Sequence, residues 1–228
     1  MSIDPATRLR VAFYDGLADV TPAQVDLTWR ELVDALTAFP EPTCSANAAD
    51  ADACRGRACR AKDGAAWSPV VVEGQRADAN VRAVTAAVFD LDHVSPTALE
   101  AVLARLDGFA AIVHSTHSHL AAGPDDGCYR LVLSLSRPAL PAEWSRARAS
   151  IVSALSLPAD PTCRDLARLY FMPTCRRGAA SFARALDGKP VDLEEALSIA
   201  SGAAGEQSGN TGTAEPVASP AAPDAIDL

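Results

Sequence analysis

The chain has 228 residues, which is enough for one domain with a hydrophobic core and a short extension. Its net charge of -9 at pH 7 argues against a protein that coats nucleic acid without sequence preference, although a local basic groove is compatible with it. No apolar run approaches the ~20 residues of a membrane span, and the first residues have neither the basic start nor the apolar core of a secretory signal. We therefore expect a cytoplasmic protein with no membrane partner.

The first part of the chain predicts an N-terminal α/β extension, which we assign to residues 1–60. Its expected elements are a strand, an amphipathic helix and a polar loop, over Arg8–Tyr14, Asp26–Phe39 and residues 43–63. The loop carries Cys54-x4-Cys59, with Cys44 upstream. This spacing is a poor zinc pattern, because it has no CxxC pair and no clear fourth ligand. We keep structural zinc only as an alternative to free thiols.

The following part, residues 61–200, predicts one domain, and residues 201–228 predict a disordered tail rich in Gly, Ala, Ser, Thr and Pro. A strand over Val70–Val72 precedes a regular series of elements. These elements are a strand ending at Asp92, a helix over Ser95–Leu106, strands over Phe109–Val113 and Cys128–Leu135, a helix over Ala142–Leu155 and a strand over Leu166–Met172. That order is typical of a ferredoxin-like or RRM-like unit, an α+β fold with an antiparallel sheet and helices on one face.

Two aspartates straddle one leucine at the end of the first of these strands, in Val88-Phe89-Asp90-Leu91-Asp92. Side chains alternate along a strand, so Asp90 and Asp92 would share a face with their Cα atoms roughly 6.5–7 Å apart. Paired carboxylates at that spacing suit a hard divalent cation such as Mg²⁺. The alternative is a strand that ends in a solvated acidic turn.

Histidines gather where the next strand ends, in His114-Ser115-Thr116-His117-Ser118-His119. A strand–helix–strand crossover makes its two strands parallel, so their carboxyl ends lie on the same side of the sheet. His117 and His119 would then approach Asp90 and Asp92. Further charged candidates for the same pocket are Arg130, Asp160 and Arg168. Acids for metal, a histidine and arginines for phosphates predict phosphoryl transfer from a triphosphate.

These motifs resemble the archaeo-eukaryotic primase superfamily, in the primase-polymerase branch of phages and plasmids. The family pattern is a strand ending in DxD/E, then Ser-x-His, then a single acid. Val88–Asp92 matches the first part, and Ser115-x-His117 fits the letter of the second. We favour His119 for the second part, because Thr116-x-Ser118-His119 before an Arg-bearing strand is similar to the phage branch. Asp160, eight residues before Arg168, matches the third acid, with Asp165 as the alternative.

The resemblance implies a DNA primase or DNA polymerase, a nucleotidyltransferase that makes or extends a chain on single-stranded DNA during replication of a mobile element. Two Mg²⁺ or Mn²⁺ ions would be held by Asp90, Asp92 and Asp160. His119 would act with these acids in catalysis and, together with Arg130, would hold the triphosphate of the incoming nucleotide. Nucleoside triphosphate would be bound by His117, Ser118, Arg130 and Arg168. A separate replicative helicase would be a further partner, and Arg176-Arg177 could contact template phosphates.

Three other interpretations stay open at the level of sequence. The first is a primase-like module that binds nucleic acid or a replication partner without catalysis. The second is a haloacid-dehalogenase-like phosphatase, with Asp90 and Asp92 in its nucleophile strand and Lys189 as the available lysine. The third is a rolling-circle initiator that uses His117-Ser118-His119 for a metal and Tyr170 as the nucleophile.

Overall fold

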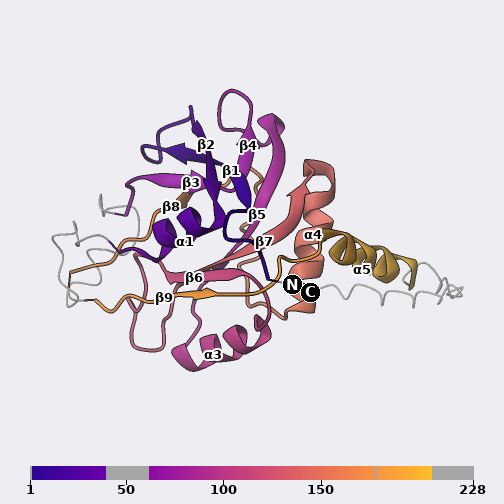
Figure 1. The fold of residues 1–228 in the computed structure, drawn as a ribbon. Coiled ribbons are helices and arrows are strands. Elements are labelled where there is room, and N and C mark those ends of the chain that lie inside the picture. Colours follow the sequence, from indigo (N-terminus) through magenta and orange to yellow (C-terminus); the bar gives the residue numbers. More distant parts are fainter. Residues whose placement is uncertain (1, 40–61, 178, 207–228) are drawn as a thin grey trace, which may run out of the picture.

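The computed structural model describes residues 2–39, 62–177 and 179–206, which form two antiparallel sheets with their helices (Figure 1). The larger sheet has the order β4-β5-β7-β6-β9 and the smaller sheet the order β2-β1-β3-β8. The larger sheet and its helices comprise β4 (Val70–Val72), β5 (Val81–Leu91), α3 (Pro96–Arg105), β6 (Ala111–Ser115), β7 (Tyr129–Ala139), α4 (Pro141–Ala154), β9 (Ala183–Leu186) and α5 (Leu193–Glu206). The smaller sheet and its helix comprise β1 (Arg8–Tyr14), β2 (Ala23–Thr28), α1 (Trp29–Thr37), β3 (Ala66–Ser68) and β8 (Tyr170–Phe171).

The predicted ferredoxin-like core is present in the larger sheet. Strands β5 and β6 both pair antiparallel with β7, which lies between them, so β5 and β6 run parallel and are joined through α3. This is the split βαβ arrangement. The predicted α+β class is therefore confirmed, and the carboxyl ends of β5 and β6 lie at the same edge of the sheet.

The fourth strand of this core is not the one that the sequence predicts. The place beside β5, which the predicted order gives to the last strand of the unit, is occupied by β4. Strand β4 precedes β5 in the chain and pairs with it through Val70–Val84 and Val71–Ala83. The predicted strand Leu166–Met172 is wrong in extent and partner, because only Tyr170–Phe171 are extended and they pair with β3 in the smaller sheet. The hairpin of β4 and β5 occupies this edge of the sheet, since it closes a shorter loop than pairing with a distant segment would.

The predicted first helix begins later than expected, because its first turn belongs to strand β2. Val25 and Leu27 pair with Val11 and Leu9 of β1, so the apolar residues there follow strand periodicity. Helix α1 then begins at a capping box. The Thr28 hydroxyl accepts the Glu31 N–H at 3.2 Å, and the Glu31 carboxylate accepts the Thr28 N–H at 2.7 Å.

Both faces of the larger sheet are buried, by different elements. Phe89 and Leu91 of β5 share a core with α3 and α4. Ala86 and Val88, on the opposite face, share a second core with α1 and Trp67. The N-terminal extension thus covers the face that the core helices leave open, and Asp90 continues the row of Ala86 and Val88 on that face.

Two further predictions, the disordered tail and the zinc alternative, fall partly or wholly outside the described residues. Helix α5 runs to Glu206, so residues 201–206 of the predicted tail are helical, while the rest of that tail lies outside the described residues. Cys44, Cys54 and Cys59 also lie outside them. Within the described part, no helix combines the length and the apolar character needed to cross a membrane.

The packing of α1 on the sheet predicts a stability effect. Leu32 is 1% exposed in the second core, so Leu32→Ala should lower the free energy of unfolding by about 2–5 kcal/mol through lost burial and a residual cavity. Leu17→Ala is the matched control, because Leu17 is 51% exposed and should change stability by less than about 0.5 kcal/mol. Urea denaturation of both variants measures the difference. Equal effects would mean that α1 is not docked as described.

Candidate active site

A cavity of about 320 Å³ opens at the edge of the larger sheet where β5 and β6 end and β7 begins. Its polar lining combines carboxylates, imidazoles and cations. These are Asp90, Asp92, His93, His114, His117, Arg130 and Lys62, and the hydroxyl of Ser118 lies beside them. The cavity therefore brings together five of the predicted nucleotide and metal residues from three strands and their loops, and it places His114 and Lys62, to which the sequence assigned no role, beside them.

A row of three side chains crosses the sheet at this edge. Asp90 of β5 is in register with Arg130 of β7, and Arg130 is in register with His114 of β6. Cross-strand partners lie on the same face, so the three side chains are neighbours there. The alternation of β6 could have placed His114 on this face from the sequence, had the strand been extended to Ser115.

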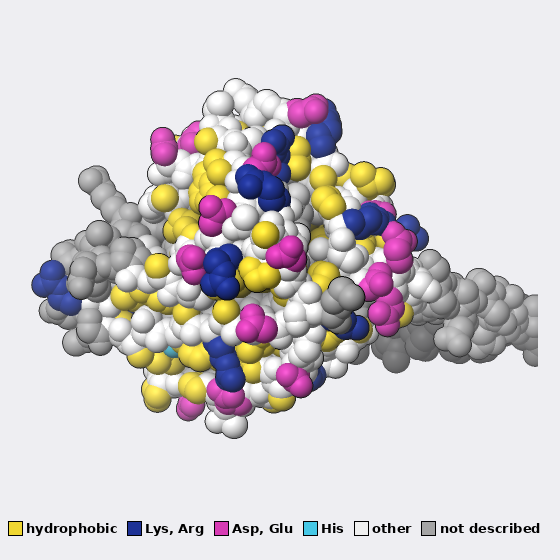
Figure 2. All heavy atoms as spheres, in the orientation of Figure 1, with side chains coloured by type: hydrophobic (Ala, Val, Ile, Leu, Met, Phe, Trp, Pro, Cys, Tyr) yellow, Lys and Arg dark blue, Asp and Glu magenta, His cyan; other side chains and the backbone are white. Residues whose placement is uncertain are grey.

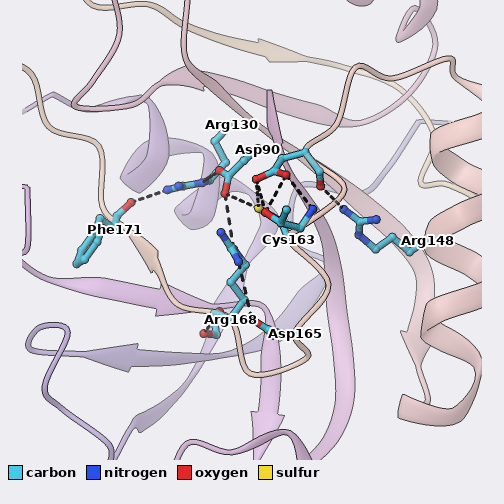
Figure 3. Close-up of polar contacts among 10 residues, drawn as sticks. Asp90, Arg130, Arg148, Cys163, Asp165, Arg168 and Phe171 are labelled. Carbon is cyan, nitrogen blue, oxygen red and sulfur yellow. Dashed lines mark hydrogen bonds and ion pairs between the residues drawn. The ribbon is translucent and has the colours of Figure 1, made fainter. Parts of the chain in front are cut away.

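Asp90 and Arg130 form a buried ion pair. The Arg130 Nε donates to Asp90 Oδ1 at 2.8 Å, and both side chains are about one-tenth exposed. The guanidinium also donates to the Phe171 carbonyl at 2.9 Å (Figure 3). It lies 4.8 Å from the centre of the Tyr170 ring. The β8 segment thus holds Arg130 from the side opposite to Asp90. A charge buried at this depth is tolerated because it is paired and hydrogen-bonded.

Asp160 lies behind Asp90 and not in the lining of the cavity. Its N–H donates to the Asp90 carbonyl at 2.9 Å, which fixes the loop against β5. The Cys163 thiol donates to Asp160 Oδ2 at 3.0 Å and lies 3.6 Å from Asp90 Oδ2, so it bridges the two acids (Figure 3). This thiol, with the backbone and hydroxyl of Thr162, lowers the pKa of Asp160 to about 2. Sequence reasoning gave Cys163 no role.

Asp92 follows β5 directly and is exposed at the mouth of the cavity. Partial desolvation, followed by the negative charges of Asp90 and Asp160, raises its pKa. The next residue, His93, has a φ of 59°, and its imidazole pairs with Asp126. A Cβ on Gly127 would lie 2.1 Å from the carbonyl oxygen of Val94, so only glycine allows the two loops to approach this closely.

The carboxylates form a hard oxygen donor set of the kind that Mg²⁺ and Mn²⁺ prefer. Asp92 senses the charges of Asp90 and Asp160, and a bound cation would relieve that repulsion. Within the described ranges, however, no three His, Cys, Asp or Glu side chains are already arranged as a metal site. The donor chemistry fits the predicted ions, and Arg130 occupies one oxygen of Asp90, Oδ1, in this structure.

The two candidate histidines differ in position. His117 lines the cavity, with Nδ1 3.0 Å from the Thr174 hydroxyl. His119 does not line it, because its Nδ1 accepts the Cys128 N–H at 3.2 Å and its ring packs edge-on against Tyr129. Burial lowers the pKa of both rings. The structure therefore brings His117, and not the favoured His119, towards Asp90 and Arg130.

The remaining predicted arginines lie outside the cavity lining. Arg168 approaches Asp90 Oδ2 at 3.7 Å and Asp165 at 3.8 Å, so it supports the buried acid from behind. Arg176 is 2% exposed and donates to the His119 carbonyl at 3.0 Å, whereas Arg177 is exposed. Only the second member of the predicted arginine pair is thus at the surface.

The geometry weighs against two of the alternative interpretations. Lys189, which a dehalogenase-type phosphatase would need in the site, lies 5.5 Å from the centre of the Phe109 ring and does not line the cavity. Tyr170, the nucleophile of the rolling-circle interpretation, is buried under Arg130, and desolvation raises the pKa of its hydroxyl. His117 and His119 also do not face the cavity together.

Comparisons with known proteins identify the family. No curated protein matches the chain. A solved structure, the AEP domain of the primase-polymerase of cyanophage S-2L, is similar at 16% identity and a TM-score of 0.43, over 86% of this chain and 90% of that one. The model of the VapE N-terminal domain matches residues 5–201, and with it the predicted primase-like superfamily is confirmed. The chain therefore belongs to the VapE N-terminal domain family.

Proposed function

We propose that this domain is a metal-dependent nucleotidyltransferase of the primase-polymerase type, which extends or starts a nucleic-acid chain on a single-stranded DNA template. One observation carries the proposal. A single cavity juxtaposes two carboxylates, Asp90 and Asp92, with the cationic groups of Arg130 and Lys62 and with His117. Triphosphate transfer needs such a set, with acids for divalent cations and cations for the phosphate oxygens.

The proposal assigns roles by position. Asp90 and Asp92, assisted by Asp160, would hold Mg²⁺ or Mn²⁺, which supplies charge neutralisation at the α-phosphate and activation of the attacking hydroxyl. Lys62, His117 and Ser118 line the same cavity as the acids and would bind the triphosphate. Asp160 already has a strongly lowered pKa, so it is ionised under all physiological conditions.

Arg130 would change partners during substrate binding. In the structure its guanidinium neutralises Asp90, and a metal ion would take over that task. The guanidinium would then be available for a phosphate, for which its planar fork gives a bidentate fit. The Phe171 carbonyl and the Tyr170 ring would keep it at the edge of the cavity during the exchange.

A DNA template would have to be bound by groups close to the cavity, not by a general attraction of the protein surface. On the face seen in Figure 2, basic and acidic side chains are interspersed and form no continuous basic patch. A net charge of -9 also gives no general attraction to DNA. We therefore expect weak, salt-sensitive template binding on which a separate helicase would improve.

Primer extension on single-stranded DNA, with Mg²⁺ or Mn²⁺ and either ribo- or deoxynucleotides, tests the function. Asp92→Asn should lower the rate by more than about 100-fold, since even residues that only support a metal ligand contribute about 10- to 100-fold. Asp92 is the cleaner target than Asp90, because Asp90→Asn would also leave Arg130 buried without its counter-ion.

The control for this assay is Asp107→Asn, an exposed acid between α3 and β6 at the opposite end of the sheet. It should extend primers as wild type does. Activity that survives in Asp92→Asn would contradict the proposed site. A folded wild-type protein that makes no product with either metal would favour the non-catalytic binding module, a role with which the Asp90–Arg130 pair is also compatible.

Measurement of nucleotide affinity distinguishes the roles of His117 and His119. His117→Ala should weaken triphosphate binding by about 10- to 100-fold, the effect of one hydrogen bond to a charged group, beside the loss of stability that truncation of a buried side chain brings. His119→Ala should lower the melting temperature and leave triphosphate affinity unchanged, because it leaves the Cys128 N–H unpaired and removes packing against Tyr129 outside the cavity lining. Titration calorimetry and thermal unfolding measure the two effects. The opposite assignment would restore His119 as the nucleotide ligand.

A further inference from the structure

One buried side chain at the cavity, that of His114, has no role in the proposed function. His114 is 1% exposed, lies near the end of β6 and lines the cavity beside Arg130. Its Nε2 has no hydrogen-bond partner among the residues that the structure describes. Buried polar atoms are nearly always paired with protein or ordered water, so an exception beside a cavity marks a position where a group that enters the cavity, a water molecule or a ligand atom, supplies the partner.

The chemistry of that nitrogen is fixed by its surroundings. Nδ1 of His114 lies 3.0 Å from the Ser115 carbonyl oxygen, which can only accept, so Nδ1 carries the proton. Nε2 is then a lone-pair acceptor. Burial, followed by the positive charge of Arg130, lowers the pKa of the ring to about 4, which keeps Nε2 an acceptor at neutral pH. The atom therefore requires a hydrogen-bond donor.

The donor cannot come from the phosphates of a nucleotide, because ionised phosphate oxygens only accept. Sugar hydroxyls do donate. His114 is two strands from Asp90, with Arg130 between them, which separates their backbones by about 10 Å at the usual strand spacing. The sugar is joined directly to the α-phosphate, so it lies next to the reacting group, whereas the base lies beyond the sugar.

We propose that Nε2 of His114 accepts a hydrogen bond from a sugar hydroxyl of the bound nucleoside triphosphate, and that His114 is thereby a specificity-determining residue for the sugar. The inference rests on the proposed function, since it places a nucleotide in this cavity. It adds to that function a contact that recognises the 2′- or the 3′-hydroxyl. Sites that hydrogen-bond a hydroxyl discriminate against analogues that lack it, because a buried polar group is then left unpaired.

The test is the binding of four adenosine triphosphates to the full chain with Mg²⁺ and without primer. The four carry ribose, 2′-deoxyribose, 3′-deoxyribose or 2′,3′-dideoxyribose. Loss of one of the two hydroxyls should weaken binding to wild type about three- to tenfold, the range of one neutral hydrogen bond. In His114→Phe, which keeps an aromatic ring but removes the acceptor, that preference should disappear. Dideoxyguanosine triphosphate serves as the control for a contact to the base.

A second measurement on wild type guards against a variant that does not fold. In a ¹⁵N-histidine spectrum, the Nε2 signal of His114 should shift on addition of the nucleotide with the recognised hydroxyl and stay in place with the dideoxy analogue. The signal is assigned by elimination with His93→Asn, His117→Gln and His119→Gln.

The outcomes separate the two claims. If wild type binds no triphosphate, the proposed function and this inference both fail. If triphosphates bind but show no sugar preference, if the preference persists in His114→Phe, or if it follows the base instead, only the inference about His114 is overturned.

Discussion

The ion pair between Asp90 and Arg130 is the interaction on which the site depends. Both side chains are about one-tenth exposed, and neither charge would be stable at that depth alone. Neighbouring groups contact both members of the pair. The Phe171 carbonyl and the Tyr170 ring hold the guanidinium, while Cys163 and Arg168 lie at the second carboxylate oxygen. The loop that carries Asp160 is tied to the same strand by a backbone hydrogen bond.

Under the proposed function, this pairing would give the site two states of balanced charge. Without substrate, Arg130 neutralises Asp90. With divalent cations and a triphosphate, the cations would neutralise the acids and the phosphates would neutralise Arg130. Such an exchange conserves the number of compensated buried charges, so it avoids the cost of several kcal/mol that an isolated buried ion carries. The smaller sheet contributes directly, because β8 belongs to it and touches Arg130.

The sequence predicts the parts of this site that follow from regular geometry. Period-two alternation and a single crossover are enough to place Asp90 near the end of β6, with Arg130 on the following strand, whereas the register that sets Asp90 opposite Arg130 comes from the structure. Alternation stops after Ser115, where the chain turns with Leu120 at a φ of 55°, so the choice between His117 and His119 depends on a turn that no periodicity describes. Lys62 reaches the cavity from a distant polar segment and Cys163 from a loop. Tertiary packing alone decides such contacts.

A crystal structure of the protein with Mg²⁺ and a non-reactive nucleoside triphosphate would test the account most directly. The proposed function predicts that the triphosphate lies in the cavity and that Asp90 binds a metal ion. It also predicts that the Arg130 guanidinium has moved from Asp90 to a phosphate oxygen. A triphosphate bound elsewhere, or bound in the cavity with the 2.8 Å contact between Arg130 and Asp90 intact, would contradict it.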